Sequence, residues 1–338
     1  MRELYAGIDI HKDKYVGCIM DAAGTVVREH TFPPTLEGAQ SFIAGMPLKG
    51  IAIEACAMWR YAHVLLRELG YTVKLSSAKK THDIACRKKT DKVDAKILAD
   101  LLRTGYLPEV YIPSDEILAM RDLCRGRATL TRMRVEVQIK IKSRLLTLGV
   151  AYPPNLWNKK NLALLLEWND PLLNNMLKIR ESIVLEEKEM ESRVENKARS
   201  HRVANLLKTI PGVGYFGALM ILSEIADIKR FKTPKQLVMY AGLCPGIYQT
   251  GNTKISVKNN AVNKWLKWIL TECSGRASTL PDNKFQLHYA QIKLRKNAKV
   301  ARRSTARMML TIIWHMLNDE QPFHASTRKE VGTGTPLT

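Results

Sequence analysis

Four carboxylates in the first 110 residues have types and positions suited to shared chemistry. Asp9 interrupts an apolar run and Glu54 ends another, although strands favour β-branched and aromatic residues at such places. Asp91 and Asp94 stand three residues apart at the start of an expected helix, so their side chains project from the same face. If the two runs are neighbouring strands, all four acids can converge at one edge of a sheet.

Such a cluster would carry a charge of about −4, which hard cations would have to offset. Mg²⁺ binds carboxylate oxygens and shares them with phosphate, and two ions about 4 Å apart can stabilise the attacking and leaving oxygens in phosphodiester cleavage. The sequence therefore predicts a Mg²⁺ site made of Asp9, Glu54, Asp91 and Asp94. The alternative stays open that Asp91 is a helix cap, Asp94 a first-turn acid and Glu54 a surface residue.

Residues 1–112 are expected to form an α/β domain that positions these acids. The pattern predicts three strands in a meander followed by alternating helices and strands, which is the order of a ribonuclease-H-like (RuvC-like) domain. The expected strands are Tyr5–Ile10, Tyr15–Met20, Thr25–Phe32, Gly50–Glu54 and Tyr71–Leu75, and the expected helices are Leu36–Ala44, Trp59–Leu69 and Lys92–Arg103.

The remainder of the chain is predicted to be mostly helical. A helical pattern from Asp115, broken at Pro153-Pro154, indicates a long antiparallel hairpin over 113–203, and Met176, Ile183 and Met190 recur at heptad spacing, as in a coiled coil. We expect a mostly α-helical C-terminal domain over 204–325, with an irregular loop near Gly242–Asn260, and a flexible tail over 326–338.

The charge of the chain points to a polyanionic partner. Its 338 residues include 53 Lys and Arg against 32 Asp and Glu, a net charge of +21, and 46% are hydrophobic, which excludes disorder as the main state. No run of 18 apolar residues and no signal peptide is visible, and the six cysteines form no C-x-x-C motif. We therefore expect a cytoplasmic protein that binds nucleic acid and no membrane.

Most of the excess charge, +13, lies in residues 206–338. Seven basic residues and no acid occur between 293 and 307, which suits neutralisation of backbone phosphates. The candidate phosphate contacts are Lys254, Lys258, Lys264, Lys267, Lys293, Arg295, Lys296, Lys299, Arg302, Arg303 and Arg307. On the hairpin, Arg121, Arg125, Arg132 and Arg144 either contact RNA or only solvate the helix.

A glycine-rich turn offers another candidate contact. Gly212-Val213-Gly214 follows a helical pattern and a proline instead of a strand, so a dinucleotide site is not expected. Between two helices, the backbone N–H groups at Gly212 and Gly214 could face a phosphate, as in a helix-hairpin-helix. A plain turn without a ligand is the alternative.

Several motifs resemble the transposases of insertion sequence family 110, which include the pilin-gene invertases. The segments Gly7–Lys12, Glu54-Ala55 and Thr90–Ala95 resemble its Asp-Glu-Asp-Asp (DEDD) signature, and Ile210–Gly214, Tyr240–Pro245 and Arg303–Leu317 resemble its C-terminal domain in the same order. The resemblance implies a mobile-element recombinase that cuts and rejoins double-stranded donor and target DNA. It also implies a structured noncoding guide RNA, a homodimer or tetramer, and a composite site formed by the metal centre of one protomer and a hydroxyl of another. A nucleoid-associated location in a prokaryotic cytoplasm is likewise implied.

In the family, a serine followed by glycine is implied to be the nucleophile that links covalently to DNA. Here Thr250 stands at that position, and its extra methyl restricts χ1 and crowds an in-line approach. Ser256 is the alternative hydroxyl, although the resemblance places it in a phosphate-contacting stretch. Two other functions remain open. One is a Holliday-junction-type metal-dependent nuclease, and the other is a catalytically retired descendant that only binds nucleic acid.

Overall fold

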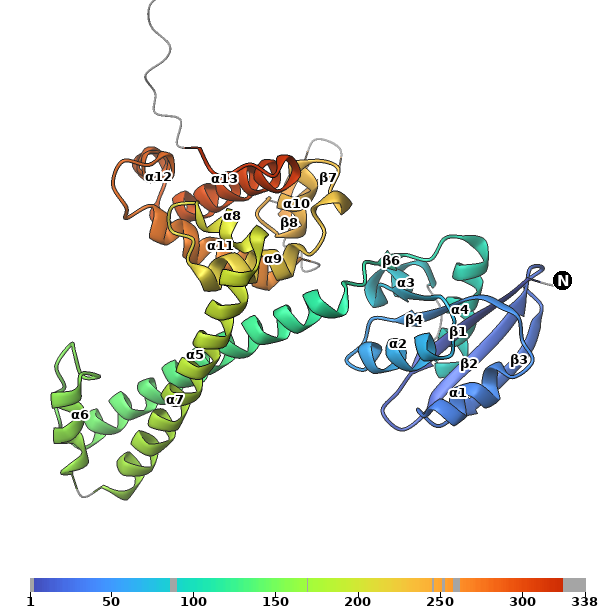
Figure 1. The fold of residues 1–338 in the computed structure, drawn as a ribbon, viewed down its shortest axis with the longest axis horizontal. Coiled ribbons are helices and arrows are strands. Elements are labelled where there is room, and N and C mark those ends of the chain that lie inside the picture. Colours follow the sequence, from blue (N-terminus) through green and yellow to red (C-terminus); the bar gives the residue numbers. More distant parts are fainter. Residues whose placement is uncertain are drawn as a thin grey trace, which may run out of the picture. The chain divides into compact units, whose positions relative to one another are not determined.

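The computed structural model describes residues 3–85, 90–168, 170–244, 246–250, 253–257 and 262–324. The chain forms two compact units, Met1–Ile112 and Pro113–Thr338, which are described separately below (Figure 1). Cys86, Lys258 and the tail over 326–338 lie outside the described residues.

A six-stranded mixed sheet forms the centre of the first unit, in the order β3-β2-β1-β4-β5-β6. β1, β2 and β3 are antiparallel, β1, β4 and β5 are parallel, and β6 is antiparallel to β5. The strands are β1 (Leu4–Ile10), β2 (Tyr15–Asp21), β3 (Val26–Phe32), β4 (Leu48–Glu54), β5 (Val73–Ser76) and β6 (Glu109–Val110). The predicted α/β class and the five predicted strands are confirmed, and β6 is an addition.

Helices pack against both faces of this sheet. The larger core lies under α1 (Leu36–Ile43) and α2 (Trp59–Glu68), where Phe42 packs against β1, β2 and β3. The opposite face of β1 is covered by α4 (Asp91–Thr104). A further helix, α3 (Ala78–Ala85), follows β5 and was not expected from the pattern.

Gly7 allows α4 to approach β1 backbone to backbone. A Cβ atom on Gly7 would lie 2.2 Å from the carbonyl oxygen of Ala95 and 2.4 Å from the amide nitrogen of Ala99. Real Cβ atoms do not come this close to backbone, so only glycine fits here. Because alternate residues of a strand share a face, Asp9 lies on the same side of β1 as Gly7, toward α4.

The second unit begins with a helical hairpin of α5 (Asp115–Thr147) and α7 (Pro171–Ser200), with α6 (Lys159–Leu166) between them. Ion pairs between the two long helices show that they run antiparallel, as predicted. The pairs are Lys197–Glu116, Arg127–Glu191 and Arg134–Glu187, and Arg144 of α5 pairs with Asp170 beside α7. Of the expected heptad positions, Ile183 is buried and Met176 packs against a buried cluster that includes Ile141 and Leu173.

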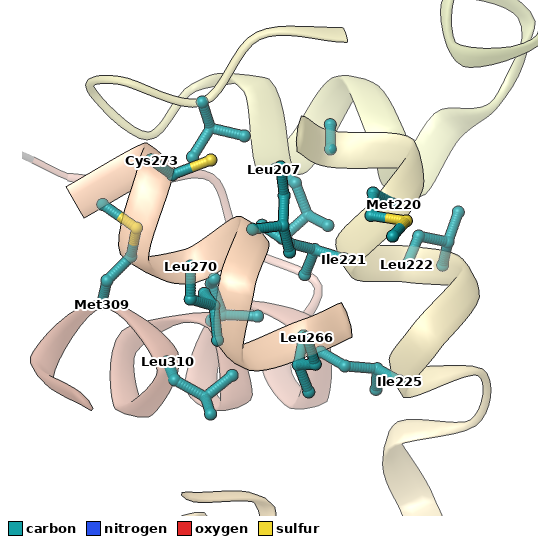
Figure 2. Packing of buried hydrophobic residues seen from close by; sticks show 14 of the residues in the cluster. Leu207, Met220, Ile221, Leu222, Ile225, Leu266, Leu270, Cys273, Met309 and Leu310 are labelled. Carbon is teal, nitrogen blue, oxygen red and sulfur yellow. The ribbon is translucent and has the colours of Figure 1, made fainter. Parts of the chain in front are cut away.

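The helical core of the second unit surrounds α9 (Tyr215–Ile225), in which every residue from Gly217 to Ile225 is buried. Figure 2 shows Met220, Ile221 and Leu222 of this helix among side chains of neighbouring helices. The other elements that contribute to this core are α8 (Arg202–Lys208), η1 (Ile228–Arg230), α10 (Pro234–Tyr240), α11 (Lys264–Ala277), α12 (Lys284–Arg295) and α13 (Ala298–Asp319), together with the ends of α5 and α7.

One expectation for this unit was wrong. The stretch near Gly242–Asn260 is not simply an irregular loop, because it contains the antiparallel strands β7 (Gly246–Thr250) and β8 (Thr253–Val257). Ile255 and Val257 alternate with polar residues there, but two five-residue runs are a weak signal beside several glycines. Among the described residues, every helix is too short or too polar to cross a membrane.

Replacing Gly7 by alanine should destabilise the first unit. The added Cβ would collide with the backbone of α4, and overpacking of this kind costs about 1–3 kcal/mol. We expect amide hydrogen exchange in β1 and β4 to accelerate accordingly.

Gly50→Ala is the matched control. Gly50 is also a buried strand glycine facing α4, but a Cβ there would meet only ordinary contacts at 3.6 and 3.7 Å. Equal acceleration by both substitutions would contradict a special role for the Gly7 contact.

Candidate functional site

Two of the four predicted carboxylates lie at one site in the first unit. His11 Nε2 is 2.9 Å from Oδ2 of Asp9 and 3.3 Å from Oδ1 of Asp91. Lys14 Nζ donates to Oδ2 of Asp91 at 2.7 Å. Asp9 is buried at 8% exposure, whereas Asp91 is partly exposed, so the site opens toward solvent on the Asp91 side.

The local structure explains why these side chains meet. β1 ends at Ile10, and the turn to β2 is closed by a hydrogen bond from the His11 amide to the Lys14 carbonyl oxygen at 3.1 Å. α4 begins at Asp91 because the Thr90 hydroxyl caps it, accepting from the amide of Val93. The packing of α4 over Gly7 then brings the first turn of that helix to the end of β1.

The Lys14 ammonium contacts Asp91, and the His11 imidazole contacts both Asp9 and Asp91. The Lys14 ammonium, by its hydrogen bond and assisted by the nearby His11, lowers the pKa of Asp91 from its usual value. The same bond raises the pKa of Lys14. Ligand atoms of Asp9, His11 and Asp91 all lie within 4.8 Å of one another, close enough for these residues to hold a metal ion. Two carboxylates and an imidazole are an oxygen-rich donor set that suits a divalent cation.

The other two predicted acids flank this group. Glu54 ends β4, one residue beyond Ile53, whose partner on β1 is Ile8, so Glu54 stands on the strand beside Asp9. Asp94 lies one turn into α4, with its amide bonded to the Thr90 carbonyl oxygen. Within the described part of the chain, neither belongs to the close group of three. A joint role for all four acids stays a prediction.

His11 and Lys14 were not identified from the sequence. A histidine two residues after Asp9 is on the same side of an extended chain, which is a usable signal. The sequence contains no comparable signal for Lys14, because only the geometry of the turn directs its side chain to Asp91.

The predicted phosphate turn lies between α8 and α9. Gly212 has φ +83°, and a Cβ there would lie 2.6 Å from the backbone of Cys273 and Ala277 in α11, so this glycine is required for internal packing. Gly214 is exposed and caps α9 without a side-chain bond. A phosphate contact at Gly214 stays a prediction.

The candidate hydroxyls lie on the β7–β8 hairpin. Thr250 is the last residue of β7 and pairs with Thr253, and Ser256 pairs with Ile247. The structure describes only the backbone here, so the side chains of Thr250, Ser256 and Lys254 fall outside it.

The predicted basic residues whose side chains the structure describes are exposed, except for Lys267 of α11, which is partly buried. Lys264 begins α11, and the dense run falls on the end of α12, the turn after it and the start of α13. Its exposed members are Lys293, Arg295, Lys296, Lys299, Arg302, Arg303 and Arg307.

Three of the four hairpin arginines make contacts within the protein, and an RNA contact of any of the four stays a prediction. Arg121 donates to the carbonyl oxygen of Ser223, Arg125 makes a two-bond pair with Glu224, and Arg144 pairs with Asp170. Arg132 remains exposed along α5 beside Thr129.

Comparison with known proteins gives consistent matches over both units. A DEDD transposase model of the IS110 group matches residues 6–149, and the model described as Transposase IS116/IS110/IS902 family matches residues 204–290. The transposase for insertion sequence element IS1328 of Yersinia enterocolitica is 25% identical over 277 residues, 79% of this chain and 82% of that protein.

Two further relatives agree with this result. The transposase for insertion sequence element IS1111A of Coxiella burnetii is 23% identical, over 74% of this chain and 70% of that protein. The y4qE protein of Sinorhizobium fredii is 30% identical over 56% of this chain, which spans only about half (48%) of that longer relative.

Removing the Lys14 ammonium should strengthen divalent-cation binding. Lys14 occupies an oxygen of Asp91 and offsets its charge, so it competes with a metal ion for the same carboxylate. We expect Lys14→Met to bind Mn²⁺ about three- to tenfold more tightly than the wild type in calorimetric titration, and Lys12→Met, which removes the same charge from the same turn, to differ little. Equal or weaker binding by Lys14→Met relative to Lys12→Met would show that Lys14 does not compete.

Neutralising Arg302 and Arg303 should weaken binding to duplex DNA without changing sequence preference. Each lost phosphate contact should reduce the slope of log K against log salt by about 0.9. Filter binding or anisotropy at several salt concentrations measures this slope. An unchanged slope and affinity would mean that the two arginines only solvate α13.

Proposed function

We propose that this chain, which belongs to the IS110 family of transposases, is a DNA recombinase. It would cut and rejoin DNA strands through a covalent hydroxyl–phosphate link. The observation that carries this proposal is the meeting of Asp9 and Asp91 at the end of β1. The sheet order β3-β2-β1-β4-β5, with its antiparallel meander and parallel crossovers, supports a ribonuclease-H-like domain.

Asp9 and Asp91 would hold Mg²⁺, with Glu54 and Asp94 completing the set from the neighbouring strand and the next helical turn. The ion, when bound, neutralises charge that develops on phosphate oxygens. The protein's part is to hold the carboxylates ionised and oriented, and the Lys14 hydrogen bond already favours the ionised form of Asp91.

The hydroxyl would come from the β7–β8 hairpin of the second unit. Thr250 is the proposed nucleophile because it ends β7 at the position of the family serine. Its hydroxyl oxygen would bond to the DNA phosphorus and lose its proton, while the phosphorus–oxygen bond of the cut strand breaks and the leaving DNA oxygen takes up a proton. A threonine hydroxyl attacks phosphorus more slowly than a serine hydroxyl when the methyl crowds the approach, and each 1.4 kcal/mol of added barrier costs about a factor of ten in rate.

The proposed partners follow from charge and from the family. Donor and target duplexes suit the exposed cations of α12 and α13, which neutralise phosphate without reading sequence. A structured noncoding guide RNA, assembly as a homodimer or tetramer, and a composite active site rest on the family resemblance. The same family supports a cytoplasmic, DNA-associated protein.

A second candidate function is favoured by Thr250 itself. A family member without the serine could cleave with metal-activated water, as a Holliday-junction-type nuclease does, or could have become a binding protein without activity. These functions predict hydrolysis without an adduct, or binding without any strand cleavage.

The test is a denaturing gel for a protein–DNA adduct in the presence of Mg²⁺, guide RNA and DNA. We expect an adduct from the wild type, about tenfold faster formation by Thr250→Ser, and none from Thr250→Ala or from Glu54→Gln.

Ser256→Ala is the internal control, because it removes the neighbouring hydroxyl of the same hairpin. An adduct that survives Thr250→Ala but is lost in Ser256→Ala would transfer the nucleophile to Ser256. The absence of an adduct even from Thr250→Ser would contradict the covalent mechanism and favour the second candidate function.

A further inference from the structure

Glu224 is a fully buried carboxylate that the proposed chemistry does not use. It lies near the end of α9 with a side-chain exposure of 0%. Its Oε1 accepts from Arg125 Nε at 2.7 Å, and its Oε2 accepts from Arg125 Nη2 at 2.9 Å and from Asn263 Nδ2 at 2.8 Å. A buried charge is costly unless it is paired in this way, so these contacts are a strong constraint on geometry.

The partners of Glu224 include both ends of the segment that carries β7 and β8. Tyr240 is the last residue of α10, and its hydroxyl donates to the Glu224 carbonyl oxygen at 3.3 Å. Asn263 caps α11, and its Nδ2 lies 3.0 Å from the same Tyr240 hydroxyl. The Asn263 amide also donates to the Tyr240 carbonyl oxygen at 2.8 Å. Residues 240 and 263 are therefore held together at the base of the hairpin.

Neighbouring contacts reinforce this base. Gly242 has φ +66°, and a Cβ there would lie 2.8–2.9 Å from the side chain of Val262. Arg307 of α13 donates to the Leu243 carbonyl oxygen at 3.1 Å. The two chain ends that lead into and out of the hairpin thus run side by side, packed on the helical core.

The same carboxylate connects this base to the long hairpin. Arg125 belongs to α5 and also lies over the Trp265 ring of α11, 5.6 Å from its centre. Arg121, one turn earlier on α5, is 3.5 Å from Glu224 and donates to the Ser223 carbonyl oxygen. Burial lowers the pKa of Arg121, and Glu224 opposes that shift.

We propose that Glu224 is a positioning residue: through Asn263 and Tyr240 it fixes the base of the β7–β8 hairpin, and through Arg125 it ties that base to α5. This inference rests on the proposed function, because it assigns Glu224 the task of presenting the attacking hydroxyl in one orientation. It holds equally for Thr250 and for Ser256, since both lie between the two fixed ends.

An apolar side chain at position 224 would fill the space but could not specify these directions. Directional, charge-assisted bonds from Arg125 and Asn263 to the Glu224 carboxylate select one rotation of α9, α5 and the start of α11 relative to one another. The buried ion pair thereby selects a single arrangement at the base of the β7–β8 hairpin, whereas an apolar side chain would contribute packing alone.

Asn263→Ser tests this role while keeping the fold. Serine is also a good helix cap and can replace Oδ1 as the acceptor for the Leu266 amide, but it is too short to reach Glu224. Asn158→Ser is the matched control, because Asn158 caps α6 by the same bond to the Asn161 amide. Tyr240→Phe is a second variant, which removes only the hydroxyl.

The first readout is amide hydrogen exchange in β7 and β8, which does not depend on catalysis. We expect Asn263→Ser to accelerate exchange there by about tenfold, Tyr240→Phe by less, and Asn158→Ser to leave it unchanged. Unchanged exchange in the hairpin of Asn263→Ser would overturn the proposal, whatever the activity of the variant.

The second readout is the rate of adduct formation at saturating DNA, measured beside the DNA dissociation constant. A positioning role predicts about a tenfold slower adduct with the dissociation constant within about twofold of wild type. Equal losses of binding and rate would instead indicate a general structural defect and would contradict the role. If the wild type forms no adduct, the proposed function fails, while the exchange experiment still decides whether Glu224 fixes the hairpin.

Discussion

The backbone contact between Gly7 and α4 is the constraint on which the candidate site depends. Any side chain at position 7 would lift the helix from the sheet, since a Cβ would lie 2.2 Å from the Ala95 carbonyl oxygen. Ala95 is one turn after Asp91, so the same contact determines how closely Asp91 approaches Asp9. A missing side chain in a strand thereby sets the distance between two carboxylates from different elements.

The second unit depends on where its acids are placed. Acids of the α5–α7 hairpin pair with cations of the same hairpin, as in Arg134–Glu187 and Arg144–Asp170. Glu224 of α9 pairs with Arg121 and Arg125 of α5. The cations from Lys293 to Arg307 have no acid among them in sequence and are exposed. The excess charge therefore remains at α12 and α13, where phosphate could approach, while the paired charges hold the fold together.

Most elements of the fold could be predicted from the sequence, because the local periodicity of apolar residues indicates strands and helices. Asp9 could be identified because an acid inside an apolar strand contradicts local preference. Lys14 could not, since its direction is set by a turn, and Arg121 and Arg125 stayed ambiguous because their partner Glu224 lies about 100 residues away. Tertiary contacts, not propensity, decide such residues.

The most direct test of this account is anomalous scattering from a crystal of the protein soaked in Mn²⁺. We expect an anomalous peak from an ion bound by carboxylate oxygens of both Asp9 and Asp91, with the Lys14 ammonium displaced from Asp91. Saturating Mn²⁺ without a peak between these two carboxylates, or with the ion bound only elsewhere, would contradict the claim that the packing of α4 on Gly7 builds a metal site.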